Sequence, residues 1–193
     1  MESNPKSKIQ NPKSPRPAVF LDRDGTLMDE VNFCRDPADV RAIPGATERL
    51  ARLRKHGWAI VVVTNQSGIG RGIISQAEYA AVHAELLRQL NDQVDGAYFA
   101  PDVPPDVSPR RKPGIGMIEE AVRDLDLDLS RSYFIGDKAI DIECGHNAGL
   151  PALLVRTGYG ANLATTGAEG EFPTVTEALD WILAREESLV ESS

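Results

Sequence analysis

Short apolar runs alternate along the chain with longer segments in which apolar residues recur every three or four positions. A short run without polar alternation predicts a strand that is covered on both faces. Such runs lie at residues 18–21, 59–63, 97–99, 132–135 and 152–155. The longer segments predict amphipathic helices, and they lie at residues 46–53, 76–90, 117–125, 138–148 and 175–183. The alternation predicts an α/β fold, in which a Rossmann-like parallel sheet carries helices on both faces.

The two ends of the chain differ in composition from this central part. Residues 1–17 contain four prolines and four basic residues but few apolar ones, which predicts a disordered N-terminal tail. Residues 18–186 are expected to form a single domain. Residues 187–193 follow the last helical pattern and end in acidic and small polar residues, so we expect them to be a frayed C-terminal end.

Composition and charge narrow the classes of partner. Of the 193 residues, 41% are apolar and 26% are charged, and the formal net charge is −8. This acidic excess disfavours nucleic acid and anionic membranes as partners. The cysteines, Cys34 and Cys144, are too few and too far apart for a disulfide framework, which favours a reducing compartment. Because no apolar run is long enough to cross a bilayer, we expect a cytoplasmic protein, and a compact monomer.

Polar side chains follow three of the predicted strands at the point where each strand ends. Asp22 and Asp24 come after the first strand, Thr64 after the second, and Asp137 after the fourth. A basic pair that includes Lys112 precedes the helix between the third and fourth strands. Ligands bind at the carboxyl ends of the strands in open α/β sheets. The sequence therefore predicts one polar site at this edge of the sheet.

The predicted site suits phosphoryl transfer. Asp22 and Asp24 lie two positions apart on an extended segment, so both face the same side. Like charges roughly 4 Å apart cost on the order of 4 kcal/mol at an effective dielectric near 20, and a divalent cation such as Mg²⁺ removes this cost. One aspartate can then attack phosphorus while the other transfers protons. Lys112 and the Thr64 hydroxyl would stabilise the phosphoryl oxygens.

Four segments resemble, in order, the four motifs of the haloacid dehalogenase (HAD) superfamily of phosphatases. They read DRDGT at 22–26, TNQS at 64–67, KP at 112–113 and GDK at 136–138. More narrowly, they resemble the heptose-bisphosphate and histidinol-phosphate phosphatases of that superfamily. The resemblance implies a HAD-like fold without a large cap domain. It also implies removal of the 7-phosphate of D-glycero-D-manno-heptose 1,7-bisphosphate, with histidinol phosphate or a broader range of sugar phosphates as alternative substrates.

The same resemblance implies a role for individual residues. Asp22 would be the nucleophile and a Mg²⁺ ligand, and Asp24 would be the acid/base and a ligand through its backbone carbonyl. Asp137 would be the third metal ligand, while Thr64 and Lys112 would bind the phosphoryl group. The remaining small phosphorylated substrate would contact Glu30, Val31, Asn32, Phe33, Asn65, Gln66, Ser67, Arg111 and Lys138.

One segment departs from the pattern of the family. Many members bind structural zinc in the loop before the RKP motif, through paired cysteines and a histidine. The corresponding positions here are Ala100, Asp102, Ser108 and Arg110, so we expect no zinc. Four prolines in this loop can limit its conformational freedom without a metal.

Two questions stay open at the level of sequence. A regulatory module that is phosphorylated on aspartate without rapid turnover is the alternative from another class, but such a module does not need a second carboxylate at Asp24. Asp141 is either a carboxylate behind the site or an exposed helix residue, and the pattern favours neither.

Overall fold

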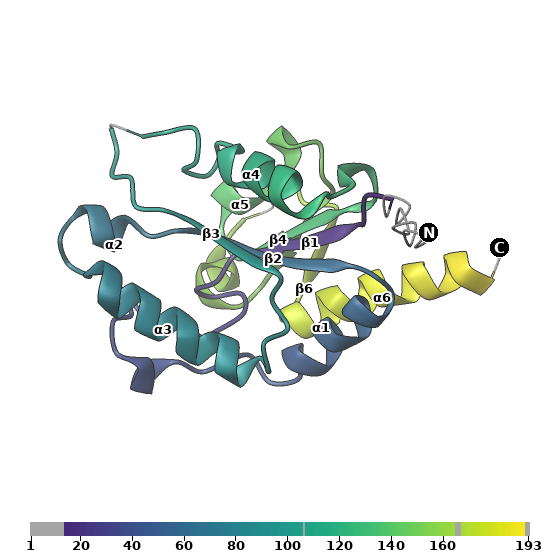
Figure 1. The fold of residues 1–193 in the computed structure, drawn as a ribbon, viewed down its shortest axis with the longest axis horizontal. Helices are drawn as coiled ribbons and strands as arrows, with labels where there is room; N and C mark the ends of the chain where they lie inside the picture. The colour runs from purple at the N-terminus through teal and green to yellow at the C-terminus, as the bar shows by residue number, and fades with distance from the viewer. Residues whose placement is uncertain (1–13, 106, 165–166, 192–193) are drawn as a thin grey trace, which may run out of the picture.

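The centre of the computed structural model is a six-stranded parallel sheet in the order β3-β2-β1-β4-β5-β6 (Figure 1). The structure describes residues 14–105, 107–164 and 167–191. The strands are β1 (Ala18–Leu21), β2 (Ala59–Asn65), β3 (Gly96–Ala100), β4 (Tyr133–Gly136), β5 (Ala152–Val155) and β6 (Gly170–Phe172). The first five match the apolar runs of the sequence, and the predicted Rossmann-like parallel sheet is confirmed.

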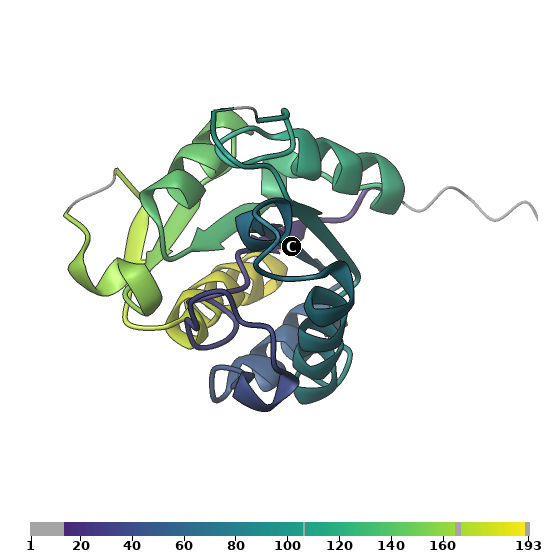
Figure 2. The same ribbon diagram turned by 90° about the vertical axis from the view of Figure 1, so that its left-hand side faces the viewer.

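Helices cover both faces of this sheet. They are α1 (Ala46–Lys55), α2 (Ser67–Gly70), α3 (Gln76–Gln89), α4 (Gly116–Leu125), α5 (Ala139–Asn147) and α6 (Val175–Glu191), with 3₁₀ segments at Pro37–Asp39, Leu129–Arg131 and Gly158–Asn162. Helices α4 and α5 lie on one face, and α1, α3 and α6 lie on the other (Figure 1, Figure 2). In the part of the chain that the structure describes, no separate cap domain stands over the sheet.

The two helical layers explain why the strands are apolar throughout. In β1, Val19 and Leu21 belong to the core beneath α1, α3 and α6, whereas Ala18 and Phe20 belong to the core beneath α4 and α5. Each strand residue therefore points into one of two dry layers, and polar alternation would bury an unpaired group. The polar residues of the chain are consequently confined to the ends of the strands.

Strand β6 was not expected from the sequence. It has the residues Gly170, Glu171 and Phe172, which contain no apolar run, and among the described strands it pairs with β5 alone, at the outer edge of the sheet. All three residues are partly or fully exposed. A short edge strand of this kind is defined by its neighbour's backbone and leaves little signal in its own sequence.

Both expected ends of the domain need correction. The Arg16 N–H donates to Asp126 O at 3.1 Å, and the Ala59 N–H donates to Pro17 O at 2.8 Å. The hydrogen-bonded fold therefore begins two residues before the expected boundary at 18, while residues 1–13 of the predicted tail lie outside the described residues. Helix α6 continues to Glu191 rather than ending at 186, and Glu187 of this last part pairs with Arg52 of α1 at 2.7 Å. Residues 192–193 are not described.

Replacement of Leu50 by alanine tests the packing of α1 on α6. Leu50 is fully buried in the layer that also contains Leu179 and Ile182 of α6. We expect Leu50→Ala to lower the free energy of unfolding by about 2–5 kcal/mol, because it removes buried methyl groups and leaves a cavity. Urea-induced unfolding followed by circular dichroism measures the change. Lys55→Ala on the exposed end of α1 should stay within about 0.5 kcal/mol of the wild type; equal effects of the two variants would contradict the packing described.

Candidate active site

Three neighbouring strands deliver polar side chains to one edge of the sheet. Strand β1 lies between β2 and β4. Leu21, the last residue of β1, is in register with Val62 of β2, three positions before that strand ends, and with Ile135 of β4, one position before that strand ends. Asp22 follows β1, Thr64 lies near the end of β2 and Asp137 follows β4. Because parallel strands end at the same side of a sheet, the structure brings these three residues together there.

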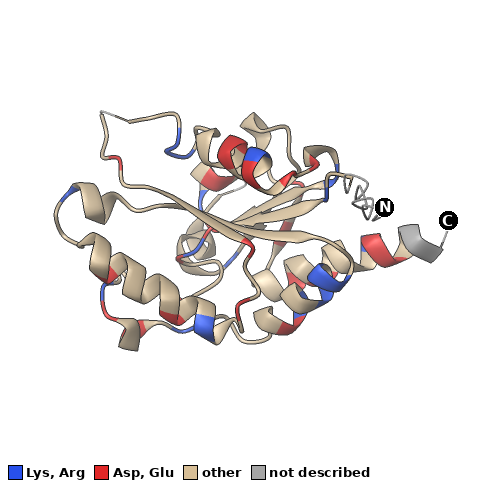
Figure 3. Cartoon of the chain, viewed as in Figure 1, with Lys and Arg blue, Asp and Glu red and all other residues tan. Residues whose placement is uncertain are grey.

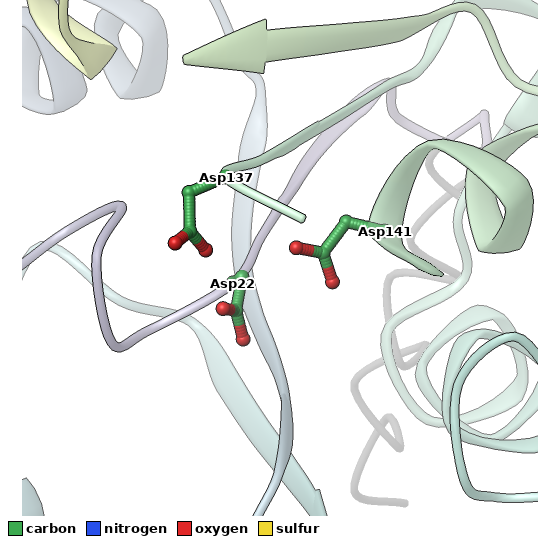
Figure 4. A group of neighbouring side chains, drawn as sticks. All are labelled: Asp22, Asp137 and Asp141. Atoms are coloured by element: carbon green, nitrogen blue, oxygen red, sulfur yellow. The ribbon is translucent and has the colours of Figure 1, made fainter. Parts of the chain in front are cut away.

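Three buried carboxylates meet at this edge. Asp22, Asp137 and Asp141 each offer an oxygen, and these oxygens lie within 4.8 Å of one another (Figure 4). Asp22 is 3% exposed and the other two are fully buried. The third carboxylate of the cluster is thus Asp141 from α5, and not Asp24 as the two-residue spacing suggested. Asp141 is therefore not an exposed helix residue.

The buried Lys112 forms ion pairs with two of these carboxylates. Its Nζ lies 2.8 Å from Asp22 Oδ1 and 2.7 Å from Asp141 Oδ1, and it also donates to Val63 O at 2.8 Å. The side chain is 2% exposed. Asn65 holds the Lys112 backbone through a reciprocal pair of hydrogen bonds at 3.0 and 3.1 Å. Lys112 is consequently fixed at both ends.

A second lysine approaches the cluster from the surface. Lys138 Nζ lies 3.2 Å from Asp137 Oδ1 and 3.5 Å from Asp22 Oδ2. It is also 3.3 Å from the backbone oxygen of Asp24 and 3.4 Å from Glu30 Oε2. Its side chain is 32% exposed, so this lysine connects the buried carboxylates to solvent.

Burial and the neighbouring charges together set the pKa values of the carboxylates. Burial by itself raises the pKa of Asp22, but Lys112 and then Lys138 outweigh burial and hold that pKa well below 3.8. Burial and the nearby Asp22 charge raise the pKa of Asp137 to about 7. The carboxylates in turn raise the pKa of both lysines, against the effect of burial. At neutral pH, Asp22 is therefore anionic and both lysines are cationic.

A glycine allows the backbone after β1 to approach Asp137. Gly25 has φ +84°, and a Cβ at this position would lie 2.4 Å from Asp137 Oδ2. Neither the left-handed backbone nor the close approach suits a residue with a side chain. The fourth residue of the DRDGT segment must therefore be glycine for steric reasons, which the spacing of the motif alone did not reveal.

The Asp24 carboxylate turns away from the cluster and binds a buried arginine. Arg23 Nε and Nη2 donate to its two oxygens at 3.0 and 2.9 Å, and Gln66 Nε2 donates at 2.7 Å. Gln66 also donates to Thr64 Oγ1 at 3.0 Å. Arg23 is 1% exposed and lies 5.1 Å from the centre of the Tyr79 ring. The sequence analysis did not single out Arg23. The signal for its role was an arginine placed directly between two aspartates after an apolar strand.

A cavity of about 220 Å³ opens beside Asp24 and Lys138. Most of the residues expected to contact substrate line it, namely Glu30, Val31, Asn32, Phe33, Asn65, Gln66, Ser67 and Lys138. Arg111 does not line this cavity, and its Nη1 donates to Asp102 O at 2.9 Å instead. Tyr159 does line the cavity but was not singled out in the sequence, because it follows the last catalytic motif by more than twenty positions.

The loop at the zinc positions of the family is held by protein groups. The Asp102 carboxylate accepts a hydrogen bond from the Ser108 N–H at 2.8 Å, and Arg110 Nε pairs with Glu120 at 2.8 Å. Ala100 ends strand β3 and offers no side-chain donor. The expectation that this chain binds no zinc stays a prediction.

Known proteins match both the sequence and this geometry. The HAD-hydrolase-like family model matches residues 109–179. A D-glycero-D-manno-heptose-1,7-bisphosphate 7-phosphatase of Thermosynechococcus vestitus is 42% identical over 160 residues, which cover 76% of this chain and 82% of that protein. The D-glycero-beta-D-manno-heptose-1,7-bisphosphate 7-phosphatase of Bordetella bronchiseptica is 34% identical and covers 91% of this chain and 98% of its own.

Solved structures agree with these likenesses. A crystal structure of the D,D-heptose 1,7-bisphosphate phosphatase from B. bronchiseptica, complexed with magnesium and phosphate, has a TM-score of 0.79 at 30% identity and covers 88% of this chain and 99% of its own. A HAD-like phosphatase structure from Mesorhizobium loti has a TM-score of 0.75 at 35% identity and covers 91% of this chain and 88% of its own.

The sheet, the carboxylate–lysine cluster at its edge and these likenesses define a hydrolase of the haloacid dehalogenase class. Within that class, the chain belongs to the family of the heptose-1,7-bisphosphate 7-phosphatases. It is an enzyme, a phosphatase that acts on a small phosphorylated substrate. The expectations for superfamily and fold are confirmed.

Removal of the Lys112 ammonium tests the charge balance of the cluster. Lys112→Met leaves Asp22 and Asp141 without their shared partner, and we expect a loss of about 3–5 kcal/mol in the free energy of unfolding at pH 7.5. The loss should be smaller at pH 5. Without Lys112, the pKa values of Asp22 and Asp141 rise in the folded variant, so these carboxyl groups take up protons on acidification and their uncompensated charge disappears. Urea unfolding at both pH values measures it. A further Asp141→Asn substitution should recover part of the stability; no recovery would contradict the ion pair.

A half-buried histidine makes the stability depend on pH. His83 stacks on Tyr79, and burial followed by the nearby Arg23 charge lowers the pKa of His83 from 6.5 to about 4. Between these values the unfolded chain binds more protons than the folded chain, so acidification from pH 7 to 4 lowers the stability. We expect His83→Gln to remove on the order of 2 kcal/mol of this loss. Thermal unfolding of both proteins between pH 7 and pH 4 measures this effect. If the melting temperatures of the wild type and of His83→Gln fall equally with pH, the histidine does not contribute to the loss.

Proposed function

We propose that this chain is a Mg²⁺-dependent phosphomonoesterase that works through a phosphorylated aspartate. The observation that carries the proposal is the state of Asp22, which is 3% exposed, has a lowered pKa and has Lys112 Nζ 2.8 Å from its Oδ1. Such a carboxylate stays anionic at neutral pH and can attack phosphorus. Neighbouring Lys138 connects it to the cavity in which an ester group can lie.

The proposed reaction has two displacements at phosphorus. In the first, an Asp22 oxygen forms a bond to phosphorus while the bond between phosphorus and the leaving oxygen breaks, and Asp24 donates its proton to that oxygen. In the second, water attacks the aspartyl phosphate, the bond to Asp22 breaks, and Asp24 accepts the proton of the water. One carboxylate thus acts as nucleophile and the other as acid and then base.

The surroundings of the two aspartates support this division. Asp22 binds Lys112, whereas Asp24 binds Arg23 and Gln66 and lines the cavity. Asp24 is thereby held beside the leaving group instead of sharing the nucleophile's partners. Lys112 and the Thr64 hydroxyl would compensate the charge that the phosphoryl oxygens develop in the transition state.

The chemistry of the cluster fits Mg²⁺. Three buried carboxylates share an edge of the sheet, and two lysines, Lys112 and Lys138, contact them. Hard oxygen donors of this kind are the ligands of Mg²⁺. Asp22, Asp137 and the backbone carbonyl of Asp24 would hold the ion, which would neutralise charge on the phosphoryl group when bound.

For the substrate, we infer D-glycero-D-manno-heptose 1,7-bisphosphate, with its 7-phosphate as the group removed. The names of relatives at 34–42% identity that match most of their own length support this inference. Histidinol phosphate or a wider set of sugar phosphates remains the alternative. Membership of a phosphatase family favours turnover over a regulatory module that only carries phosphate on aspartate.

The predicted partners and location stay predictions. Acidic and basic residues are interspersed along α1 and α4 (Figure 3), in keeping with our expectation that nucleic acid is not a partner. Among the helices that are described, none is both long and apolar enough to cross a membrane. We keep a monomer in the cytoplasm as the predicted state. Cys34 and Cys144 are buried and form no disulfide, which is compatible with a reducing compartment.

Substitution of the two aspartates tests the proposed roles. With Mg²⁺ present, we expect release of phosphate from heptose bisphosphate to be at least tenfold faster than from histidinol phosphate or simple sugar phosphates.

Asp22→Asn should abolish turnover, because an amide does not replace the carboxylate nucleophile. Asp24→Asn should lower kcat by about 10²–10⁴-fold, the usual contribution of general acid–base catalysis. Chelation of the metal should stop turnover until Mg²⁺ is restored.

The exposed Asp39 provides the matched control. Asp39→Asn makes the same chemical change outside the cavity lining, and its kcat should equal that of the wild type. Undiminished turnover by Asp22→Asn would overturn the proposed nucleophile. Equal rates on all the phosphate esters would instead support the broader substrate range.

A further inference from the structure

The Lys138 ammonium lies among the same three groups that are proposed to hold Mg²⁺. Its Nζ is 3.2 Å from Asp137 Oδ1, 3.5 Å from Asp22 Oδ2 and 3.3 Å from the backbone oxygen of Asp24. Two carboxylate oxygens and one carbonyl oxygen thus converge on a single cation from the chain itself.

The contacts of Lys138 are looser than those of Lys112. Lys112 Nζ binds its oxygens at 2.7–2.8 Å and is 2% exposed, whereas the oxygens nearest to Lys138 lie at 3.2–3.5 Å and its side chain is 32% exposed. Charge-assisted hydrogen bonds are usually 2.7–2.9 Å long. Lys138 is therefore held mainly by the negative potential of the cluster and not by tight directional bonds.

Lys138 also has partners outside the cluster. Its Nζ lies 3.4 Å from Glu30 Oε2 and 4.9 Å from the centre of the Tyr159 ring. Glu30, Tyr159 and Lys138 itself all line the cavity. The side chain can consequently leave the three oxygens and still retain a carboxylate and an aromatic face as partners.

The backbone segment that carries Tyr159, residues 157–159, is hydrogen-bonded to the same site. The Tyr159 N–H donates to Asp137 Oδ2 at 2.8 Å, and the Thr157 hydroxyl donates to Gly25 O at 2.5 Å. Between them, Gly158 has φ +50°, and a Cβ there would lie 2.4 Å from Asp137 Oδ2. None of these contacts involves Lys138, so the segment would keep its place against the cluster if the Lys138 side chain moved.

We propose that Lys138 is an internal cation that neutralises the metal site when it is empty and must leave its three oxygens when Mg²⁺ enters. An ammonium and a divalent ion cannot occupy the space between the same three oxygens at once, because their repulsion would be large at such a separation. Lys138 therefore lowers the affinity for Mg²⁺ and stabilises the metal-free protein. After displacement, it lies against Glu30 and Tyr159 in the cavity wall, where it can meet an anionic substrate. This inference rests on the proposed function, since it requires Mg²⁺ at these oxygens.

Magnesium binding without substrate tests the inference. Calorimetric titration of the metal-free full chain with MgCl₂ gives the Kd of the wild type and of Lys138→Met. We expect the variant to bind Mg²⁺ at least about fivefold more tightly, because its ligands are no longer shared with an ammonium. Lys55→Met removes the same charge from the exposed end of α1 and should leave Kd within about twofold of the wild type.

Stability provides a second measurement that a purely structural role would not reproduce. In the presence of a chelator, Lys138→Met should melt at a lower temperature than the wild type; saturating Mg²⁺ should remove or reverse this difference, because a ligand bound more tightly stabilises more. An equal loss with and without Mg²⁺, or an unchanged Kd, would overturn the role of Lys138. If Lys138→Met does not fold, Lys138→Gln serves in both measurements. A wild type that does not bind Mg²⁺ would instead overturn the proposed function.

Discussion

The electrostatic balance between three buried carboxylates and two lysines is the constraint on which this site depends. Asp22, Asp137 and Asp141 lie within 4.8 Å of one another at one sheet edge, where their mutual repulsion is weakly screened by solvent. Lys112 binds two of them from inside, and Lys138 binds two from the surface. The two lysines lower the pKa of Asp22 against the effect of burial, whereas burial and the Asp22 charge raise the pKa of Asp137.

The architecture supplies the dry environment in which these charges act strongly. Helices on both faces make the strands apolar along their whole length, so polar groups are concentrated where the strands end. The central position of β1 between β2 and β4 then places Asp22 among groups from three segments. Tight loops complete the site, because Gly25 and Gly158 allow two backbone segments to contact Asp137.

Two aspartates that differ by two positions acquire different environments. Asp22 shares Lys112 with Asp141, whereas both oxygens of Asp24 are taken by Arg23, with Gln66 as a further donor. This separation of partners is what the proposed reaction requires, since the nucleophile must stay anionic while the other carboxylate gives up and takes back a proton. Arg23 is itself almost fully buried against Tyr79, so the position of Asp24 is linked to the packing of α3.

Much of the fold was predictable from local patterns, because buried strands and amphipathic helices have distinct apolar periods. The five apolar runs correspond to β1–β5, and the strand-end residues Asp22, Thr64 and Asp137 lie at the same edge of the sheet, as the topology requires. The sequence by itself thus determined the sheet, the edge that holds the site and the family motifs. The tertiary structure alone decided that Asp141 and not the Asp24 carboxylate completes the cluster, that Arg23 binds Asp24 and that Lys138 lies among the expected metal ligands. Those outcomes depend on side-chain directions and on contacts between residues distant in sequence, which no local pattern specifies.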